Sequence, residues 1–307
     1  MQNLIINSHK FSYVVNKLRG FFLNKGFVEV HTQNRLSILA ACEDPTTIST
    51  FNYANNVFPL PQTGQMWLEW AMLTNPKPPG YFCVSTSYRN EKNPVPGRHQ
   101  IIFPMFEFEQ PGGFDELKKM EVDLLDHLGY RNKDNKNVPY LYGDYSDIAQ
   151  MFKTEDISHK HEMELYNTLK NKNTNTNTNK NMPANSVFLL ENFPEYTSPF
   201  WNMRRDPVTG TANKVDIIMS GMETIGSAER EVDVDVMRKR FNTISDGKYA
   251  ALLYKLFGEK RVNDELDEFL SLKFFPRSGG GIGMTRLIRS MEMEGLIPAN
   301  VIEAGKQ

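Results

Sequence analysis

The sequence predicts an α+β fold in which an antiparallel sheet of about six strands is flanked by helices. Residues 81–88 and 101–109 have the composition of strands, and the loop between them contains prolines and a glycine, which is the pattern of a hairpin. Residues 8–25 and 114–128 carry apolar side chains at helical spacing. Hairpins with interspersed helices favour an antiparallel sheet.

The remaining elements follow from the same two periodicities. The helix at 8–25 ends before Gly26, a residue that suits a helix stop. Residues 171–181 read NKNTNTNTNKN, a polar tract of low complexity, so we expect a surface insertion near residues 170–184. Further strands are predicted at 27–32, 187–190 and 214–219, and further helices at 66–73 and 234–243; residues 57–60 form a short apolar run.

The composition restricts the class of protein. The chain has 307 residues, 40% hydrophobic and 23% charged, which suits one large domain or two small ones. Its 35 Lys and Arg against 37 Asp and Glu give a net charge of −2, which indicates no general attraction to nucleic acid. Two cysteines, Cys42 and Cys83, argue against a disulfide framework and a Cys-built zinc site. We find no signal peptide and no run of about 18 apolar residues, so we expect a cytoplasmic protein with no membrane partner.

The hairpin segment reads SYRNEKNPVPGRHQIIFPMFEFE and contains residues suited to a nucleotide. Arg89 and Glu91 are two positions apart, so on a strand they would point to the same face. Arg98 and His99 fall in the loop, and Phe103 begins the return strand. Planar Arg side chains bind phosphate oxygens, and a purine needs an aromatic or aliphatic platform. An Arg-x-Glu pair taken alone is, however, more often a surface ion pair.

A glycine-rich run, SGGGIGMTRLIRS, lies near the end of the chain. Its glycines, which include Gly281 and Gly283, leave room for close approach of the backbone to a ligand. Arg286 would lie in the first turn of the following helix. The run is not a Walker A loop, because no Gly-Lys-Ser/Thr follows. A nucleotide-binding turn and a merely flexible turn before a helix both fit it.

A third segment, KVDIIMSGMETIGSAERE, contains a pair of carboxylates. Asp216 and Glu223 are suited to magnesium that carries phosphate oxygens. Arg230 lies seven residues beyond Glu223. Each residue alone is more often an ordinary surface charge, but three such segments in this order favour a nucleotide site.

The ordered set of segments resembles the catalytic domain of the class II aminoacyl-tRNA synthetases. The Arg-x-Glu hairpin is similar to motif 2 of that family, and the glycine-rich run before an Arg-bearing helix is similar to motif 3. Four further segments resemble the aspartate and asparagine branch, which includes stand-alone asparagine synthetase-like relatives. They are GFVEVHTQ (26–33, motif 1), CEDP (42–45), QTGQMWLE (62–69) and METIGSAERE (222–231).

The resemblance implies a single class II synthetase-type catalytic domain over residues 1–307 that uses ATP and Mg²⁺. Arg89 and Arg286 would be the catalytic residues, because they would stabilise the charge of the transferring phosphates. Mg²⁺ would be carried by Asp216 and Glu223. ATP would be bound by Arg89, Glu91, Arg98, His99, Phe103, Gly281, Gly283 and Arg286.

The resemblance also implies an amino-acid site. Aspartate-specific members have a lysine at the position of Leu68, whereas Glu107 matches the acidic residue that meets the side-chain amide in asparagine enzymes. A carboxylate without that lysine favours an amide over a negative side chain. The implied substrate-binding residues are Glu43, Thr63, Gln65, Leu68, Glu107 and Arg230.

Two other positions depart from the family pattern. Gln33 replaces the proline that usually ends motif 1, the segment of the family's dimer interface; a homodimer is still expected. Ile102 replaces a Glu that usually precedes Phe103, which weakens the assignment of contacts to the adenine edge.

We expect no anticodon-binding domain, and this expectation is the basis for our choice of function. Because the first helix begins almost at Met1, our first interpretation is a stand-alone asparagine synthetase-like enzyme that activates aspartate and admits ammonia. Leu68 and Glu107 favour asparagine as the substrate, and the sequence leaves the two open. The alternatives are a tRNA ligase that lacks its anticodon domain, with tRNA as partner, and a catalytically silent amino-acid-binding regulator. A lysine-type ligase is disfavoured, because Arg230 would meet a cationic side chain.

Overall fold

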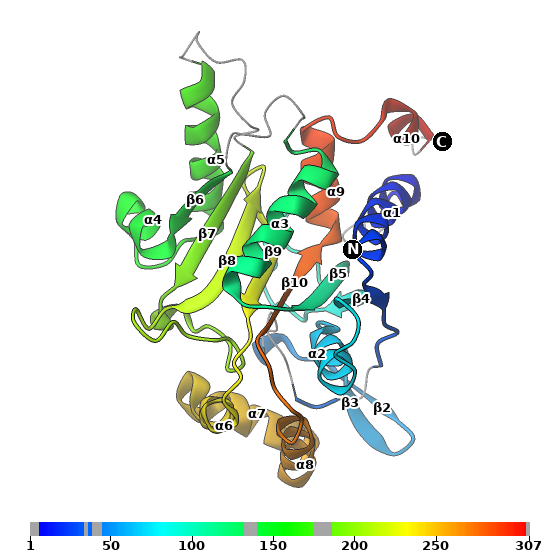
Figure 1. Ribbon diagram of the computed structural model, residues 1–307, viewed down its shortest axis with the longest axis vertical. Helices are drawn as coiled ribbons and strands as arrows, with labels where there is room; N and C mark the ends of the chain where they lie inside the picture. Colours follow the sequence, from blue (N-terminus) through cyan, green and yellow to red (C-terminus); the bar gives the residue numbers. More distant parts are fainter. Residues whose placement is uncertain (1–5, 34–35, 39–44, 132–139, 175–185, 305–307) are drawn as a thin grey trace.

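A computed structural model describes the fold over residues 6–33, 36–38, 45–131, 140–174 and 186–304 (Figure 1). Within these residues, eight strands form one sheet and two strands form a separate hairpin. The hairpin consists of β2 (Thr50–Tyr53) and β3 (Asn56–Pro59). In sheet order the eight strands are β1 (Val28–Glu29), β4 (Tyr81–Tyr88), β5 (Ile102–Pro111), β10 (Arg277–Gly283), β9 (Met222–Glu229), β8 (Ala212–Met219), β7 (Val187–Phe193) and β6 (Leu141–Asp144).

Most neighbouring strands are antiparallel, and only the two outermost pairs of the described sheet, β1–β4 and β6–β7, are parallel. The predicted α+β class is confirmed, although the sheet is larger than expected. Short 3₁₀ helices lie at Pro45–Thr47, Glu195–Thr197 and Ile244–Gly247. The helices are α1 (Ser8–Asn24), α2 (Gln65–Thr74), α3 (Phe114–Leu128), α4 (Tyr145–Phe152), α5 (His159–Thr174), α6 (Val234–Thr243), α7 (Lys248–Phe257), α8 (Glu259–Leu270), α9 (Met284–Met293) and α10 (Ala299–Ala304).

Helices α1, α3 and α9 cover one face of the sheet and bury the main core (Figure 1). Because side chains alternate along a strand, Phe106 and Phe108 of β5 point into this core and Glu107 and Glu109 point to the opposite face. Phe22 of α1 stacks on both phenylalanines, with ring centroids 5.2 and 5.4 Å apart. Burial of each such side chain contributes about 1.5–3 kcal/mol. One face therefore stabilises the fold while the other presents polar groups.

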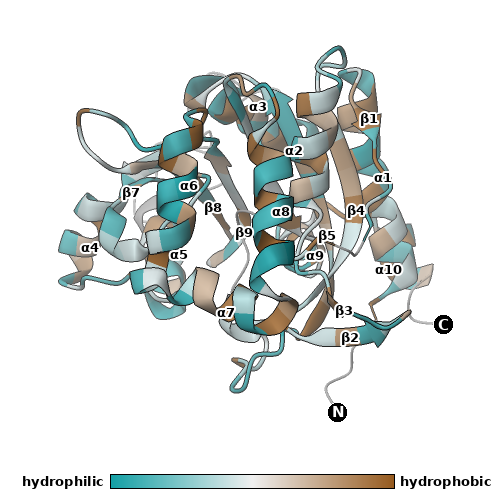
Figure 2. Ribbon diagram, turned by 90° about the horizontal axis from the view of Figure 1, so that it is seen from below, coloured by the Kyte–Doolittle hydropathy of each residue, from teal (hydrophilic) through white to brown (hydrophobic). Residues whose placement is uncertain are grey.

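A second hydrophobic cluster joins α6, α7 and α8 to the end of the sheet at which the chain leaves β9 (Figure 1). Trp201 is fully buried there, with its ring centroid 5.4 Å from that of Phe241 and 6.2 Å from that of Phe269. Figure 2 views this end from below and shows α6 and α8 with mainly hydrophilic residues on their outer sides. Helices α4 and α5 pack over β6, β7 and β8, at the edge of the sheet formed by β6.

The glycine-rich run, expected as a turn, is the central strand β10, which is hydrogen-bonded to β5 and β9. A Cβ atom at Gly280 would lie 2.6 Å from the carbonyl oxygen of Gly226, and one at Gly279 would overlap the carboxylate of Glu109. Glycine at these positions therefore lets the three central strands approach one another. The expectation of a turn was wrong because glycine is depleted in ordinary strands.

The other predicted elements agree with the structure to different degrees. Helices α3 and α6 coincide with the predicted ranges, while the strand predicted at 27–32 is reduced to the two residues of β1. Helix α5 continues to Thr174, so the first residues of the predicted insertion are helical and residues 175–185 lie outside the described chain. Among the described helices, none is both long and apolar enough to cross a membrane.

Candidate functional site

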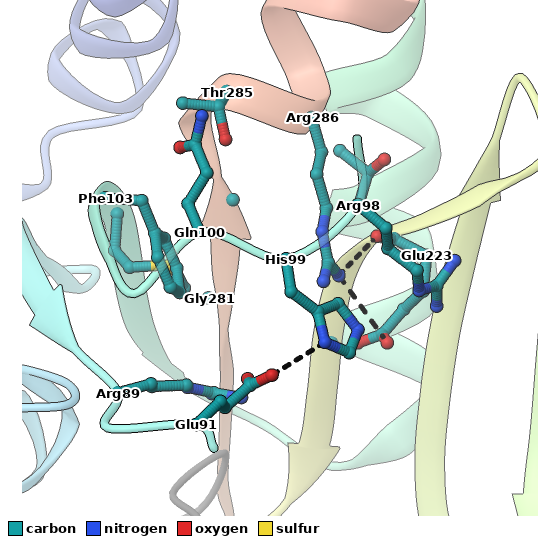
Figure 3. A pocket seen from close by; sticks show the side chains of 14 residues that line it. Arg89, Glu91, Arg98, His99, Gln100, Phe103, Glu223, Gly281, Thr285 and Arg286 are labelled. Atoms are coloured by element: carbon teal, nitrogen blue, oxygen red, sulfur yellow. Dashed lines mark hydrogen bonds and ion pairs between the residues drawn. The ribbon is translucent and has the colours of Figure 1, made fainter. Parts of the chain in front are cut away.

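A cavity of about 200 Å³ lies on the face of the sheet opposite to α1, α3 and α9 (Figure 3). Its walls are the loop between β4 and β5, the start of β5, the strand β9 and the junction of β10 with α9. Three segments that are far apart in the sequence therefore meet here. Among the lining residues are all eight that were predicted to bind ATP: Arg89, Glu91, Arg98, His99, Phe103, Gly281, Gly283 and Arg286.

The loop of the hairpin positions the first of these side chains. Strand β4 ends at Tyr88, so Arg89 and Glu91 lie in the loop and not on a strand. The prediction that strand alternation puts them on one face is therefore wrong, although both side chains line the cavity. The backbone N–H of Arg89 donates to the carbonyl of Ile101 at 2.8 Å, which closes the base of the loop.

Close polar contacts link the side chains of the cavity to one another (Figure 3). His99 Nδ1 lies 2.6 Å from Glu91 Oε2 within the loop. Arg286 Nη1 donates to the carbonyl oxygen of Glu223 at 2.8 Å and lies 3.8 Å from its Oε2. Burial lowers the pKa of Arg286, and Glu223 opposes this shift.

Arg98 is held by a residue that no motif indicated, Glu162 of α5. Arg98 Nη1 donates to Glu162 Oε2 at 2.8 Å, and Nη2 donates to Oε1 at 2.7 Å. The side chains are 12% and 8% exposed, so solvent screens this two-bond pair only weakly.

An aromatic platform and a glycine floor complete the cavity. The guanidinium carbon of Arg89 lies 5.9 Å from the ring centroid of Phe103. A Cβ atom at Gly281 would approach Met105 Cε to 2.8 Å, so a side chain larger than that of glycine would crowd this part of the cavity. A flat ring beside several cations suits a nucleotide, whose base stacks and whose phosphates are negative.

The two carboxylates predicted to carry Mg²⁺ lie on adjacent strands, Asp216 on β8 and Glu223 on β9. Glu223 lines the cavity; Asp216 is 8% exposed and receives a 2.6 Å hydrogen bond from Lys214 Nζ on its Oδ2. Asp216 Oδ1 is buried with no hydrogen-bond partner among the described residues. Burial raises the pKa of Asp216 to about 7 against the opposing effect of Lys214, with a further contribution from Glu223. An orphaned buried oxygen beside a second carboxylate fits a divalent cation whose remaining ligands are phosphates and water.

The pKa of Glu223 is shifted in the opposite direction. Burial would raise it, but Arg286, Lys214, Arg98 and Arg89 together lower it below its usual value. Glu223 is therefore ionised at neutral pH and available to a cation.

Beside this cavity on the same face, Glu107 accepts hydrogen bonds from four surrounding groups, one of which is the thiol of Cys83 at 3.7 Å. Ser85 Oγ donates at 2.5 Å and the N–H of Gly64 at 2.7 Å, and Thr63 Oγ1 also donates. Glu107 is 1% exposed, and burial raises its pKa against these hydrogen bonds. Glu107 is the register partner of Gly281, which places this polar cluster next to the cavity floor.

Two residues beyond Glu107 on β5, Glu109 belongs to a fully buried cluster of two arginines and two glutamates. Arg230 Nη2 lies 3.1 Å from Glu109 Oε2, and Arg277 Nη2 lies 2.5 Å from Glu69 Oε2. Cross contacts of 3.8 Å (Arg230 to Glu69) and 3.9 Å (Arg277 to Glu109) close the cluster. Gln65 Nε2 donates to Glu109 Oε2 as well. Arg230 and Gln65 thus lie in a buried network and are not among the residues that line the cavity.

The remaining predicted substrate residues are placed as follows. Leu68 is fully buried in a cluster with Met72, Tyr81 and Cys83, so the structure places it in a hydrophobic core and not in the wall of a site. The reason is its position on the inner side of α2. Glu43 lies outside the described residues.

Sequence reasoning missed several residues of the cavity. Met105, Thr224 and Gly226 line it because strand alternation turns them to the open face. Gln100 and Thr285 are neighbours of predicted residues, so the motifs could have indicated them. No motif indicated Glu162, because it lies on α5, outside every motif, and contacts the site through Arg98.

Comparisons with known proteins identify the family of the chain. The family model of tRNA synthetases class II (D, K and N) matches residues 2–297. The chain is 23% identical over 296 residues to the cytoplasmic aspartate–tRNA ligase of Pongo abelii, an alignment that covers 90% of this chain and 55% of that protein. It thus spans about half the length of that curated relative.

Solved structures show the same fold. The asparaginyl-tRNA synthetase from Pyrococcus horikoshii, complexed with asparaginyl-adenylate, superposes with a TM-score of 0.67 at 20% identity, over 92% of this chain and 64% of that one. The aspartyl-tRNA synthetase from Entamoeba histolytica gives a TM-score of 0.62 at 20% identity, over 92% and 54%. The chain therefore belongs to the class II tRNA synthetases (D, K and N), in the aspartyl and asparaginyl branch of that family.

Proposed function

We propose that the chain activates aspartate or asparagine with ATP to form an aminoacyl-adenylate and pyrophosphate. The observation that carries the proposal is the convergence of Arg89, Arg98 and Arg286 with the ring of Phe103 in one cavity. Fixed guanidinium groups suit a polyphosphate, and the ring suits an adenine base.

The reaction needs no protein nucleophile. A carboxylate oxygen of the amino acid attacks the α-phosphorus, a new P–O bond forms, and the bond to the bridging oxygen of the β-phosphate breaks. Arg89 would neutralise the charge that develops on the α-phosphate, and Arg98 and His99 would hold the leaving pyrophosphate. Phe103 would stack on one face of adenine and Arg286 would cover the other face or meet the γ-phosphate. Catalysis thus rests on position and charge.

Mg²⁺ would be held by Asp216 and Glu223 and would neutralise charge on the leaving phosphates. Glu223 lines the cavity, and Asp216 lies on the neighbouring strand β8 as the register partner of Gly226, which also lines the cavity. The low pKa of Glu223 supports this role, since the carboxylate is ionised wherever ATP is fully charged.

The charges around the predicted amino-acid-binding residues support asparagine as the better substrate. Arg230 is already matched by Glu109 and by the more distant Glu69, so its charge is not left over for a substrate carboxylate. Glu107 adds a buried carboxyl group that suits an amide donor. Leu68 is an apolar residue at the position where aspartate-specific members have a lysine, so this position supplies no cation for a substrate carboxylate. We expect aspartate to be used less well.

For the acceptor we propose tRNA, and this replaces our first interpretation of a stand-alone asparagine synthetase-like enzyme. The support comes from the comparisons, in which the curated relatives are aspartate–tRNA ligases and the solved structures are tRNA synthetases. We further propose a homodimer, as the family resemblance implies, and a cytoplasmic location, as in the name of the relative from Pongo abelii.

Amino-acid-dependent exchange of pyrophosphate into ATP tests the proposal, with aspartate and asparagine assayed in parallel and without tRNA. We expect exchange with asparagine above that with aspartate. Exchange with aspartate alone would contradict the asparagine assignment, and release of free asparagine on addition of ammonia would restore the first interpretation. The absence of ATP binding would leave only the catalytically silent regulator.

A further inference from the structure

We propose that Glu162 is a resident counter-anion that occupies the phosphate-binding fork of Arg98 until ATP displaces it. This inference rests on the proposed function, since it assigns Arg98 to the triphosphate. Glu162 would then be a positioning residue that sets the affinity of the cavity for ATP without touching the nucleotide.

The first step concerns the fork of Arg98. Both terminal nitrogens are used, at 2.8 and 2.7 Å, by the two oxygens of Glu162. A phosphate group binds arginine through the same parallel pair of N–H bonds. Arg98 lines the cavity, yet it cannot give this fork to a phosphate while Glu162 holds it. Binding of a triphosphate is therefore an exchange of carboxylate oxygens for phosphate oxygens.

The second step concerns which partner of the pair is fixed. Glu162 Oε2 also accepts the backbone N–H of Glu223 at 2.8 Å, so the carboxylate is anchored to strand β9. The helix that carries it is packed closely on the β8–β9 turn, where a Cβ atom at Gly221 would come within 2.8 Å of Met163 Sδ. Arg98, in contrast, extends from the loop between β4 and β5. Glu162 thus holds Arg98 from a rigid support.

The third step concerns charge. The cavity brings Arg89, Arg98 and Arg286 together, and the proximity of the other two contributes to the lowered pKa of Arg286. Without an anion these like charges oppose one another. Glu162 adds a negative charge beside Arg98 when ATP is absent, and its influence reaches Arg286 as well. Once ATP arrives, its phosphates take over this role.

The test is titration of MgATP by calorimetry into the wild-type chain and into Glu162→Gln. The amide keeps the shape of the side chain but removes its charge, so we expect the Kd for ATP to fall about fivefold, which corresponds to about 1 kcal/mol. Glu164→Gln is the matched control, because Glu164 is an exposed residue of the same helix; its Kd should stay at the wild-type value.

Two further variants separate this role from general electrostatics and from misfolding. In an Arg98→Met background, Glu162→Gln should leave the Kd unchanged, because the competition acts only through Arg98. If Glu162→Gln does not fold, Glu162→Asp replaces it, since the shorter carboxylate cannot reach both nitrogens and should lower the Kd by a smaller factor. Weaker or unchanged ATP binding in the single variant, or an effect that persists without Arg98, would overturn the inference. If the wild-type chain and every variant fail to bind ATP, both this inference and the proposed function fall; if only the expected shift is missing, the proposed function stands.

Discussion

Arg230 and Glu109 form an ion pair from which solvent is fully excluded, with Nη2 and Oε2 3.1 Å apart. A charge removed from such a pair leaves the other buried and uncompensated. We predict that Arg230→Met lowers the free energy of unfolding by about 3–5 kcal/mol. Urea denaturation measures this, and Arg238→Met is the control, because Arg238 pairs with Asp267 at the surface, with side chains 45% and 61% exposed. Equal effects of both variants would contradict a structural role for the buried cluster.

A buried carboxyl group beneath the sheet makes stability depend on pH. Glu121 of α3 is fully buried and receives a 2.5 Å hydrogen bond from Ser227, and burial raises its pKa to about 8. Between the usual pKa of the unfolded chain, about 4.3, and that of the folded chain, the folded state binds the extra proton, so stability falls as pH rises through this window.

We predict that Glu121→Gln is more stable than the wild type at pH 8 and that this advantage shrinks toward pH 5. Glutamine can still accept the hydrogen bond of Ser227, and it cannot ionise. Thermal melts between pH 5 and 8 measure the difference, which we expect to reach a few degrees. Asp115→Asn, an exposed change on the same helix, should not alter the slope. An unchanged slope in Glu121→Gln would show that Glu121 does not titrate in this range.

The proposed stacking of adenine gives a third prediction. Phe103→Leu keeps an apolar side chain but removes the flat ring, and stacking of a base on an aromatic side chain contributes about 1–3 kcal/mol. We expect the KM for ATP in the exchange assay to rise about tenfold. The KM for the amino acid should change little. Tyr53→Leu, a change of an exposed aromatic residue on the separate β2–β3 hairpin, serves as the control.

The glycines of β10 give a fourth prediction. In Gly280→Ala, the new methyl group would meet backbone oxygen of Gly226 at 2.6 Å, and a strand in the middle of a sheet cannot move aside. We expect a loss of several kcal/mol or failure to fold, measured by chemical denaturation. Gly20→Ala meets nothing within 4 Å and lies inside α1, so it should stabilise the chain by about 0.5–1 kcal/mol. A stable Gly280→Ala variant would contradict the tight packing of the three strands.

Local patterns predicted the parts of the fold that local interactions determine. The apolar spacing of α3 and α6 and the loop of the β4–β5 hairpin are properties of short stretches, and the structure has them where they were expected. Strand β10 escaped prediction because its four glycines are suited to the crowding of neighbouring strands, which is a tertiary property.

The same distinction applies to the site. The residues of the hairpin and of the β10–α9 junction were found because each belongs to a recognisable motif. The burial of Arg230 and Leu68 could not be predicted, because their surroundings come from α2, β4 and β5 together. Glu162 meets Arg98 across 64 positions of sequence, and no local pattern encodes such a contact.

The place of β10 in the sheet has a consequence for biosynthesis. Of the described strands, β10 is the last to leave the ribosome. In the sheet it nevertheless lies between β5 and β9, with three strands on one side and four on the other. Until residues 277–283 emerge, β5 and β9 lack the strand that pairs with both of them in the folded sheet. The loop between β4 and β5 and the carboxylates of β8 and β9 lie on opposite sides of β10 in the sheet. The cavity therefore cannot be complete before this short glycine strand has been synthesised.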